Sequence, residues 1–356
     1  MPSDDRPPGS TVNQERSPHE SFRAETRAPA QEQDVLGAAE AGFSLSGATG
    51  WLNSPPLSTA ELRGRVVLIS FWTYTCINWL RSLPHVRAWN AFYRPQGLVV
   101  VGVHSPEFSF ERDVDNVRWA ADALAVDYPI AIDNRFAVWR SFDNHYWPAL
   151  YLLDVHGRLR HQRFGEEGYE ETETVIRQLV VEAGAADVGT QRAPVDARPL
   201  EAPADWGNLR SAETYLGYDR TSGFASRGGL VPDEPYDYSA PARLRLGTWA
   251  VSGSWTVASE FAALPSSPGR LSCCFHARDV HLVAAPLTRG ARVGMRVLLD
   301  GHQPGPDHGV DLDAAGRGGI AEPRLHQLIR QSDRVTDHTV EIDLEPGVGV
   351  FALTFG

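Results

Sequence analysis

The residue with the clearest capacity for chemistry is Cys76, in the segment Trp72-Thr-Tyr-Thr-Cys-Ile-Asn-Trp79. A continuous apolar run at 65–72 precedes it and an apolar pattern of helical spacing at 77–93 follows it, so we expect the thiol at the start of a helix. Free N–H groups and the partial positive charge of a helix N-terminus favour a thiolate. We therefore predict that Cys76 is a nucleophile with a pKa below the usual value of about 8.5. The alternative is a small buried residue without reactivity.

Trp79 stands where a C-x-x-C motif has its second cysteine. In such a motif the first thiolate attacks a disulfide and the second cysteine resolves the mixed disulfide. Without that second thiol, an adduct on Cys76 persists until an external thiol attacks it. The two remaining cysteines, Cys273 and Cys274, are neighbours on an expected strand, so one should be buried and one exposed. Either could resolve the adduct only if the C-terminal region docks over Cys76.

A second kind of thiol chemistry is suggested by Thr73, three residues before Cys76. A one-cysteine peroxidase needs a polarising hydroxyl beside a single thiolate, and the segment resembles the peroxiredoxin pattern Pro-x-x-x-Thr-x-x-Cys. Ile69 occupies the proline position, so only half of the pattern is present.

The elements that must position Cys76 alternate between strands and helices. Apolar runs predict strands at 65–72, 97–103, 129–132, 147–153 and 158–164, and helical spacing predicts helices at 77–93, 110–124, 136–141 and 170–183. Thr75 is the candidate N-cap of the first helix, and Pro84 is expected to kink it. This order predicts a three-layer α/β fold over residues 36–183.

The pattern changes after a linker at 184–205 that is rich in Ala, Pro and Asp. Short alternating segments separated by Gly, Pro and Asp predict strands at 243–246, 254–257, 271–277, 280–284, 294–299, 335–342 and 349–355. Residues 206–356 should therefore form an all-β sandwich of jelly-roll type. Residues 1–35 lack apolar periodicity and are predicted to be a disordered tail.

Several segments resemble DipZ-type thioredoxin-like proteins, a branch of the TlpA/ResA group. They are the Cys76 segment with Leu83-Pro-His-Val86, and Gly47–Asn53, Gly102–Phe108, Tyr128–Asn134, Tyr146–Ala149 and Glu213–Gly217. The resemblance implies a thioredoxin fold followed by a β-sandwich similar to carbohydrate-binding modules. Family members often follow a membrane-embedded electron-transfer domain.

The same resemblance assigns roles to individual residues. It implies that Pro148 is a cis-proline facing the cysteine, with the backbone before it pairing with an extended peptide. A trans proline opening an edge strand is the alternative. Trp72 and Trp147 would flank the thiol, so Trp72, Trp79 and Trp147 are candidate substrate-docking residues, although such aromatics also fill cores. TlpA-type proteins often carry an acid three positions after the second cysteine, where this chain has Ser82.

Two groups in the C-terminal region could bind ligands. Asp300-Gly-His-Gln-Pro-Gly-Pro-Asp-His308, with Asp311 and Asp313, gathers metal-ligand side chains, but its spacing fits neither an EF-hand nor a zinc helix and is typical of a polar hairpin loop. Trp249, Trp255, Tyr236 and Tyr238 could stack on sugar rings or fill the sandwich core. The sequence predicts no metal site and no cofactor.

The amino-acid composition limits the kinds of binding partner and the cellular location that we expect. With 45 acidic and 33 basic residues the net charge is −12, which argues against nucleic acid because phosphate binding needs a concentrated positive surface. Three cysteines cannot form a disulfide framework in 356 residues, which favours a reducing compartment. The sequence shows no apolar stretch of signal-peptide or membrane-span type, so a cytoplasmic location is predicted.

The sequence thus predicts a thiol-redox protein that acts through Cys76 alone. A protein or a low-molecular-weight thiol or disulfide would be its partner, and an external thiol would resolve the adduct. The alternatives are a redox-inactive binding or scaffold module that keeps the thioredoxin fold, and a one-cysteine peroxidase. Substrate and oligomeric state are not predicted.

Overall fold

Six strands form one mixed sheet in the first part of the chain. The computed structural model describes residues 43–186 and 188–356, and the sheet order is β1-β4-β3-β2-β5-β6. The strands are β1 (Gly50–Leu52), β2 (Val66–Trp72), β3 (Leu98–His104), β4 (Ile130–Ile132), β5 (Ala149–Leu153) and β6 (Leu159–Phe164). β2, β3 and β4 run parallel, and the other pairs are antiparallel. The five predicted strands are present, whereas β1 was not predicted.

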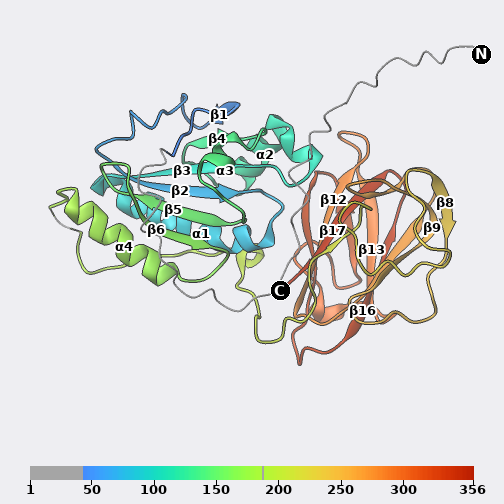
Figure 1. The fold of residues 1–356 in the computed structure, drawn as a ribbon. Helices are drawn as coiled ribbons and strands as arrows, with labels where there is room; N and C mark the ends of the chain where they lie inside the picture. The colour runs from blue at the N-terminus through green and yellow to red at the C-terminus, as the bar shows by residue number, and fades with distance from the viewer. Residues whose placement is uncertain (1–42, 187) are drawn as a thin grey trace, which may run out of the picture. The chain divides into compact units, whose positions relative to one another are not determined.

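Helices cover both faces of this sheet (Figure 1). They are α1 (Ile77–Tyr93), α2 (Val114–Ala123), α3 (Ala137–Ser141) and α4 (Tyr169–Glu182), with short 3-10 turns η1 (Arg94–Gln96) and η2 (Ser109–Arg112). α1, α2 and α4 share an apolar cluster with one face, and α3 packs in the cluster on the other. α2 begins later than predicted because Asp113 caps it, its side chain accepting from the Asp115 N–H. This arrangement is the predicted three-layer thioredoxin fold.

α1 is buried around most of its circumference. Besides residues of the sheet, its apolar cluster includes Val283, Leu325 and Phe351 from the C-terminal region. A helix with apolar neighbours on two sides needs no single apolar stripe. Pro84 lies inside α1 as predicted, but the N-cap is Cys76 rather than Thr75. The Thr75 hydroxyl instead donates to Glu111 at 2.6 Å.

The C-terminal region is built from antiparallel strands. They are β7 (Thr214–Tyr215), β8 (Pro235–Tyr238), β9 (Trp249–Val257), β10 (Ala262–Leu264), β11 (Gly269–Phe275), β12 (Asp279–Pro286), β13 (Val293–Leu299), β14 (Arg317–Ile320), β15 (Arg324–Arg330), β16 (His338–Leu344) and β17 (Val348–Phe355), with 3-10 turns η3 (Pro199–Glu201) and η4 (Gly305–Asp307). The main strand order is β14-β13-β16-β11-β9-β10-β17-β12-β15. This is the predicted β-sandwich class, and the jelly-roll type stays a prediction.

Several strand predictions in this region need correction. Residues 243–246 form no strand, because Arg243, Arg245 and Leu246 are exposed and the alternation does not mark a buried face. β7, β8, β10, β14 and β15 were not predicted, and β9 begins at Trp249, earlier than the predicted 254. The short and partly exposed strands β8 and β14 carry little apolar alternation, which is why the pattern missed them.

Strand β9 joins the two layers of the sandwich. Residues 249–252 pair with β11, whereas 256 and 257 pair with β10. Gly253 lies between these segments with φ +102°, a conformation that other residues rarely adopt. The change of layer therefore occurs at a glycine, as is common where a strand bends.

The two regions share buried contacts. Arg81 of α1 forms ion pairs with Glu166 at 3.3 Å and with Asp279 of β12 at 3.8 Å, with 1% of its side chain exposed. In the predicted linker, Glu201 of η3 accepts from Arg87 of α1 at 2.7 Å. The described residues group into one compact unit. The division into domains at 184–205 therefore stays a prediction, and the predicted tail lies outside the described residues.

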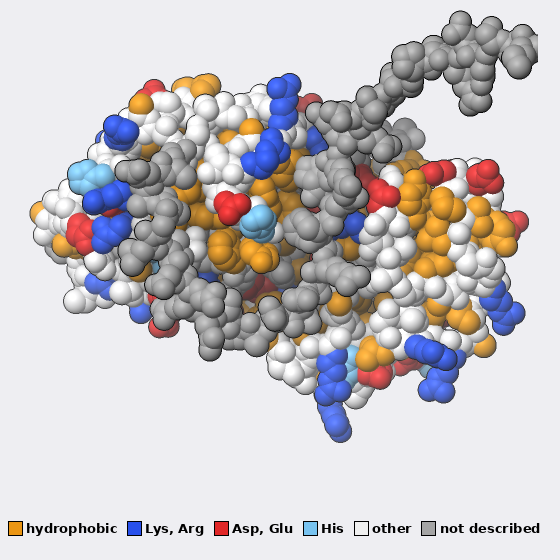
Figure 2. Space-filling view, viewed as in Figure 1, with side chains coloured by type: hydrophobic (Ala, Val, Ile, Leu, Met, Phe, Trp, Pro, Cys, Tyr) orange, Lys and Arg blue, Asp and Glu red, His pale blue; other side chains and the backbone are white. Residues whose placement is uncertain are grey.

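Two surface properties bear on possible partners. Among residues 43–186 and 188–356, the helices are too short or too polar to cross a bilayer. On the face drawn in Figure 2, the basic side chains of the described residues lie in small separate groups. That face offers no continuous basic surface of the kind that phosphate backbones require.

Candidate functional site

The structure brings Cys76 together with the loop that contains Pro148. Cys76 follows β2 and caps α1, and its side chain is partly exposed. Its thiol donates to the carbonyl oxygen of Trp147 at 3.8 Å. The Trp147–Pro148 peptide bond is cis, and β5 begins directly after it. The Cys76 sulfur thus faces the carbonyl oxygen of Trp147, two residues before β5 begins.

The predicted low pKa of Cys76 is wrong. Backbone N–H groups of Asn78 and Trp79, at the helix start, do lower the pKa of the thiol as expected. Burial raises the pKa more strongly, and the carboxylates of Glu107 and Glu213 raise it further, so the net pKa lies well above its usual value. In this structure Cys76 is a protonated thiol at neutral pH.

Trp72 and Trp79 are core residues rather than a docking surface. Both side chains have 0% exposure, and their rings stack with centroids 4.3 Å apart. The indole at position 79 therefore fills the core side of α1 and presents no surface to a substrate. Trp147 is partly buried and packs on Trp139 with ring centroids 4.5 Å apart. It is the one of the three predicted docking tryptophans that keeps exposed surface.

A buried acid that the sequence did not predict, Glu111, is hydrogen-bonded to Thr75, the residue before Cys76. Glu111 is fully buried and accepts hydrogen bonds from the hydroxyl of Thr75 and from the N–H groups of Glu107 and Phe108, at 2.6, 2.5 and 2.9 Å. Burial raises the pKa of Glu111 to about 7. Ser82, at the position where the resemblance implies an acid, is buried and donates to the Trp79 carbonyl at 2.8 Å. The buried acid of this site thus comes from η2 rather than from α1.

A cluster of charged residues joins the C-terminal region to this site. The hydroxyl of Tyr215 lies 2.8 Å from a carboxyl oxygen of Glu107 and 2.8 Å from one of Glu213. Arg220 donates to Glu107 at 3.0 Å and stacks over the Tyr215 ring at 3.4 Å. The segment Glu213–Gly217, one of those that carry the family resemblance, thus contributes two members of this cluster, Glu213 and Tyr215.

Counting hydrogen atoms constrains the protonation of this cluster. One hydroxyl hydrogen cannot serve two carboxylates, so one carboxyl must donate to the Tyr215 oxygen. Glu107 forms an ion pair with Arg220 at 3.0 Å, whereas burial raises the pKa of Glu213 to about 7. At neutral pH and below, Glu213 is therefore the carboxyl that holds the proton. Above its pKa of about 7 it is a carboxylate, and this is the form that raises the pKa of the Cys76 thiol.

The remaining cysteines lie in the sandwich. Cys273 is 1% exposed within the sandwich core, and Cys274 is partly exposed in a groove with Asp337 and His338. The strand alternation predicted for this pair is confirmed. All three cysteines of the chain are free thiols, and neither of these two belongs to the apolar cluster around Cys76.

The other candidate residues are dispersed. Thr73 is fully buried, so its hydroxyl does not face solvent. Trp249, Trp255 and Tyr238 are sandwich core residues, and Tyr236 is 38% exposed.

The carboxylates of the Asp300–Asp313 loop are engaged by neighbouring groups. Asp300 contacts His338 at 2.6 Å, Asp307 accepts from Ser332, and Asp311 pairs with Arg324 at 2.6 Å. The described residues contain no group of three or more His, Cys, Asp or Glu side chains arranged to hold a metal ion.

Known proteins resemble both regions. Residues 211–356 match the family described as the thioredoxin-like C-terminal domain. The protein DipZ of Mycobacterium tuberculosis is 35% identical over 315 residues, which cover 88% of this chain and 42% of DipZ. The chain thus spans less than half the length of the DipZ proteins that it matches.

Shorter relatives match the α/β region. A solved structure titled as a thioredoxin-like protein in the oxidised form has 30% identity and a TM-score of 0.35, covering 38% of this chain and 90% of that one. The thiol-disulfide oxidoreductase YkuV of Bacillus subtilis is 30% identical over 138 residues, covering 39% of this chain and 93% of YkuV. Because YkuV is 30% identical and is covered over 93% of its length, and because the chain has this fold, the chain belongs to the thioredoxin-like protein family.

Proposed function

We propose that this protein is a monothiol redox protein that exchanges disulfides through Cys76. The Cys76 thiolate attacks a disulfide R–S–S–R, forming Cys76–S–S–R and releasing RS⁻, which takes up the proton that Cys76 lost. An external thiol R′–SH then attacks the R sulfur of the adduct, giving R–S–S–R′ and restoring the Cys76 thiol. No net oxidant or reductant is consumed beyond these thiols and disulfides.

The observation that carries this proposal is the position of Cys76. Cys76 is a partly exposed residue, and its sulfur lies 3.8 Å from the Trp147 carbonyl, beside the backbone that begins β5. An extended peptide that paired with this backbone would bring its own disulfide to Cys76. The relatives named thiol-disulfide oxidoreductases support the same class of chemistry.

Adduct formation tests the proposal directly. The full chain is incubated with oxidised glutathione at neutral and at alkaline pH, and peptide mapping by mass spectrometry locates the adduct. We expect the adduct on Cys76, more of it at alkaline pH, and loss of this adduct in Cys76→Ser but not in the matched variant Cys274→Ser. Absence of any Cys76 adduct at both pH values would overturn the proposal.

Restoring the second thiol tests whether the chain lacks only the resolving cysteine or whether the site has changed in other ways as well. Trp79→Cys recreates C-x-x-C, but it also opens a cavity, and removing a buried Trp side chain costs about 3–5 kcal/mol. Trp79→Ser is therefore the matched control, because it opens a similar cavity without a thiol. Insulin reduction by the folded Cys variant but not by the Ser variant would show that the resolving thiol was the missing part.

The raised pKa of Cys76 favours a second candidate, a binding module without redox activity. Burial together with Glu107 and Glu213 disfavours the thiolate that exchange requires. Under this alternative Cys76→Ser leaves partner binding unchanged. The peroxidase alternative gains no support, since it needs a reactive thiolate beside an accessible hydroxyl, whereas Thr73 is buried.

A further inference from the structure

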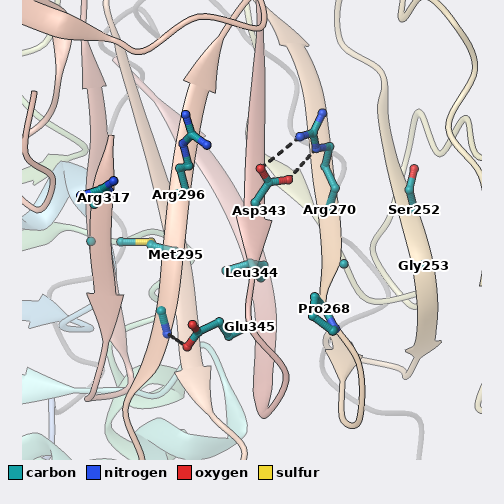
Figure 3. A pocket seen from close by; sticks show the side chains of 13 residues that line it. Ser252, Gly253, Pro268, Arg270, Met295, Arg296, Arg317, Asp343, Leu344 and Glu345 are labelled. Carbon is teal, nitrogen blue, oxygen red and sulfur yellow. Dashed lines mark hydrogen bonds and ion pairs between the residues drawn. The ribbon is translucent and has the colours of Figure 1, made fainter. Parts of the chain in front are cut away.

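A groove crosses the outer face of the sandwich, away from the residues described above. Its volume is ≈ 680 Å³, within the size range of small-molecule sites, and its lining comes from strands β9, β11, β13, β14 and β16 together with the turn before β11. Figure 3 shows the polar side chains standing on this face, with Arg317 on β14, Arg296 on the neighbouring β13 and Arg270 on β11, and with Asp343 on β16 between Arg296 and Arg270.

Strand register places five polar residues in one row across this groove. Arg317 of β14 lies opposite Arg296 of β13, which lies opposite Asp343 of β16. Asp343 in turn lies opposite Arg270 of β11, and Arg270 lies opposite Ser252 of β9. The row reads cation, cation, anion, cation, hydroxyl.

The charges in this row are unequally satisfied. Arg270 donates to both oxygens of Asp343, at 2.6 and 3.0 Å, and to Glu341 at 2.9 Å. By contrast, Arg296 and Arg317 are exposed, and their guanidinium groups form no hydrogen bond or ion pair with the residues that the structure describes. Like charges directly opposite on adjacent strands destabilise a sheet. The fold itself therefore gains nothing from placing these two arginines together.

Two glycines beside the arginine pair allow other charged side chains to lie against the sheet. Gly294 and Gly319 lie opposite each other, two residues along from Arg296 and Arg317 on the same face. A Cβ at Gly294 would come within 2.7 Å of the Glu345 carboxylate, which accepts from the Gly294 N–H at 2.9 Å. A Cβ at Gly319 would likewise come within 3.1 Å of the Arg292 side chain, so one carboxylate and one further guanidinium group lie over the sheet beside the arginine pair.

We propose that this groove binds a small acidic ligand, with one carboxylate or phosphate group held between Arg296 and Arg317. Guanidinium groups bind such oxyanions through paired hydrogen bonds. Ser252 and Asp343, in the same row, offer a hydroxyl and an acceptor to polar groups further along the ligand. None of the residues that line the groove is aromatic, so recognition here depends on charge rather than on ring stacking.

Calorimetric titration of the full chain tests the site. The probes are digalacturonate, inorganic phosphate and the neutral disaccharide lactose. We expect binding of at least one anion, weakening with added salt, and no binding of lactose. Comparing the titrations with digalacturonate and with inorganic phosphate distinguishes a carboxylate ligand from a phosphate ligand. Failure of both anions to bind, or equal binding of lactose, would overturn the proposal.

Variants assign any binding to the arginine pair. Arg296→Gln and Arg317→Gln are each expected to lower affinity about tenfold, the effect of one lost charged hydrogen bond. Arg65→Gln, an exposed arginine outside the groove, is the matched control and should bind as the wild type does. Because β14 ends the strand order, its arginines could instead protect a sheet edge. If the variants self-associate but bind the anions as the wild type does, the arginines protect the sheet edge, and the anion-binding proposal is overturned.

The proposal for the groove and the proposal for the thiol site can be overturned independently of each other. Cys76→Ser should leave anion affinity unchanged, and Arg296→Gln should leave the glutathione adduct on Cys76 unchanged. An anion effect that depends on Cys76 would overturn the assignment to the groove.

Discussion

The Cys76 site and the Arg296–Arg317 groove place charge in opposite surroundings. Around Cys76 the carboxyls of Glu107 and Glu213 are held by Tyr215, and Glu107 is also paired with Arg220. In the groove Arg296 and Arg317 face solvent with no partner among the described side chains. In the first surrounding, low polarity and close carboxylates decide where a proton resides. In the second, water screens the charges, so they contribute little to stability and are available to a ligand.

The largest effect that tests this comparison is expected at Arg81. Arg81→Ala removes the buried partner of Glu166 and Asp279 and should lower the free energy of unfolding by about 3–5 kcal/mol. Urea unfolding measures this difference. Arg65→Ala is the exposed control, for which a change within about 0.5 kcal/mol is expected. Similar losses in the two variants would show that burial does not separate these charges.

Glu111 tests whether burial of an acid sets the pH dependence of stability. Its pKa is raised to about 7 in the fold, so the folded state holds the proton more tightly than the unfolded chain. The contribution of Glu111 to the free energy of unfolding should therefore fall as pH rises from about 4.5 to 7. Glu111→Gln keeps an acceptor oxygen for Thr75 and should flatten this part of the profile. An unchanged profile in chemical unfolding across this range would contradict the expectation.

A Glu213 variant tests whether a nearby carboxylate controls the pKa of the Cys76 thiol. Glu213→Gln removes a carboxylate that raises the pKa of Cys76, so the thiolate should form at lower pH. Alkylation of Cys76 by iodoacetamide, followed by peptide mass spectrometry, should become several-fold faster at mildly alkaline pH. The pH profile distinguishes this effect from a general loosening of the fold, which would also expose the buried Cys273. Faster labelling of both cysteines would indicate loosening instead.

The smallest effect is expected in the groove. Arg317→Gln removes one of two opposed positive charges, so the free energy of unfolding should stay within about 0.5 kcal/mol of the wild type or rise slightly. Thermal unfolding in the absence of anions measures it. A loss above about 1 kcal/mol would mean that Arg317 stabilises the fold and is not reserved for a ligand.

Local pattern was sufficient for much of the α/β region. Continuous apolar runs mark β2 and β3 because these strands are buried on both faces, and the helix after Cys76 follows from apolar spacing. Pattern failed at 243–246, where alternating residues are exposed, and at the short strands β8 and β14. Short strands at a surface are held by their neighbours rather than by their own sequence.

The sequence by itself determined that this chain has a cysteine at a helix start and a tryptophan where a second cysteine would resolve its adducts. It also indicated the order of strands and helices around them, because these features depend on residues close together in the chain. Only the tertiary structure decided that Trp79 is a core residue, that Glu107 and Glu213 approach Cys76, and that Arg296 stands opposite Arg317. Burial and strand register bring distant residues together, and they reversed the expected direction of the Cys76 pKa.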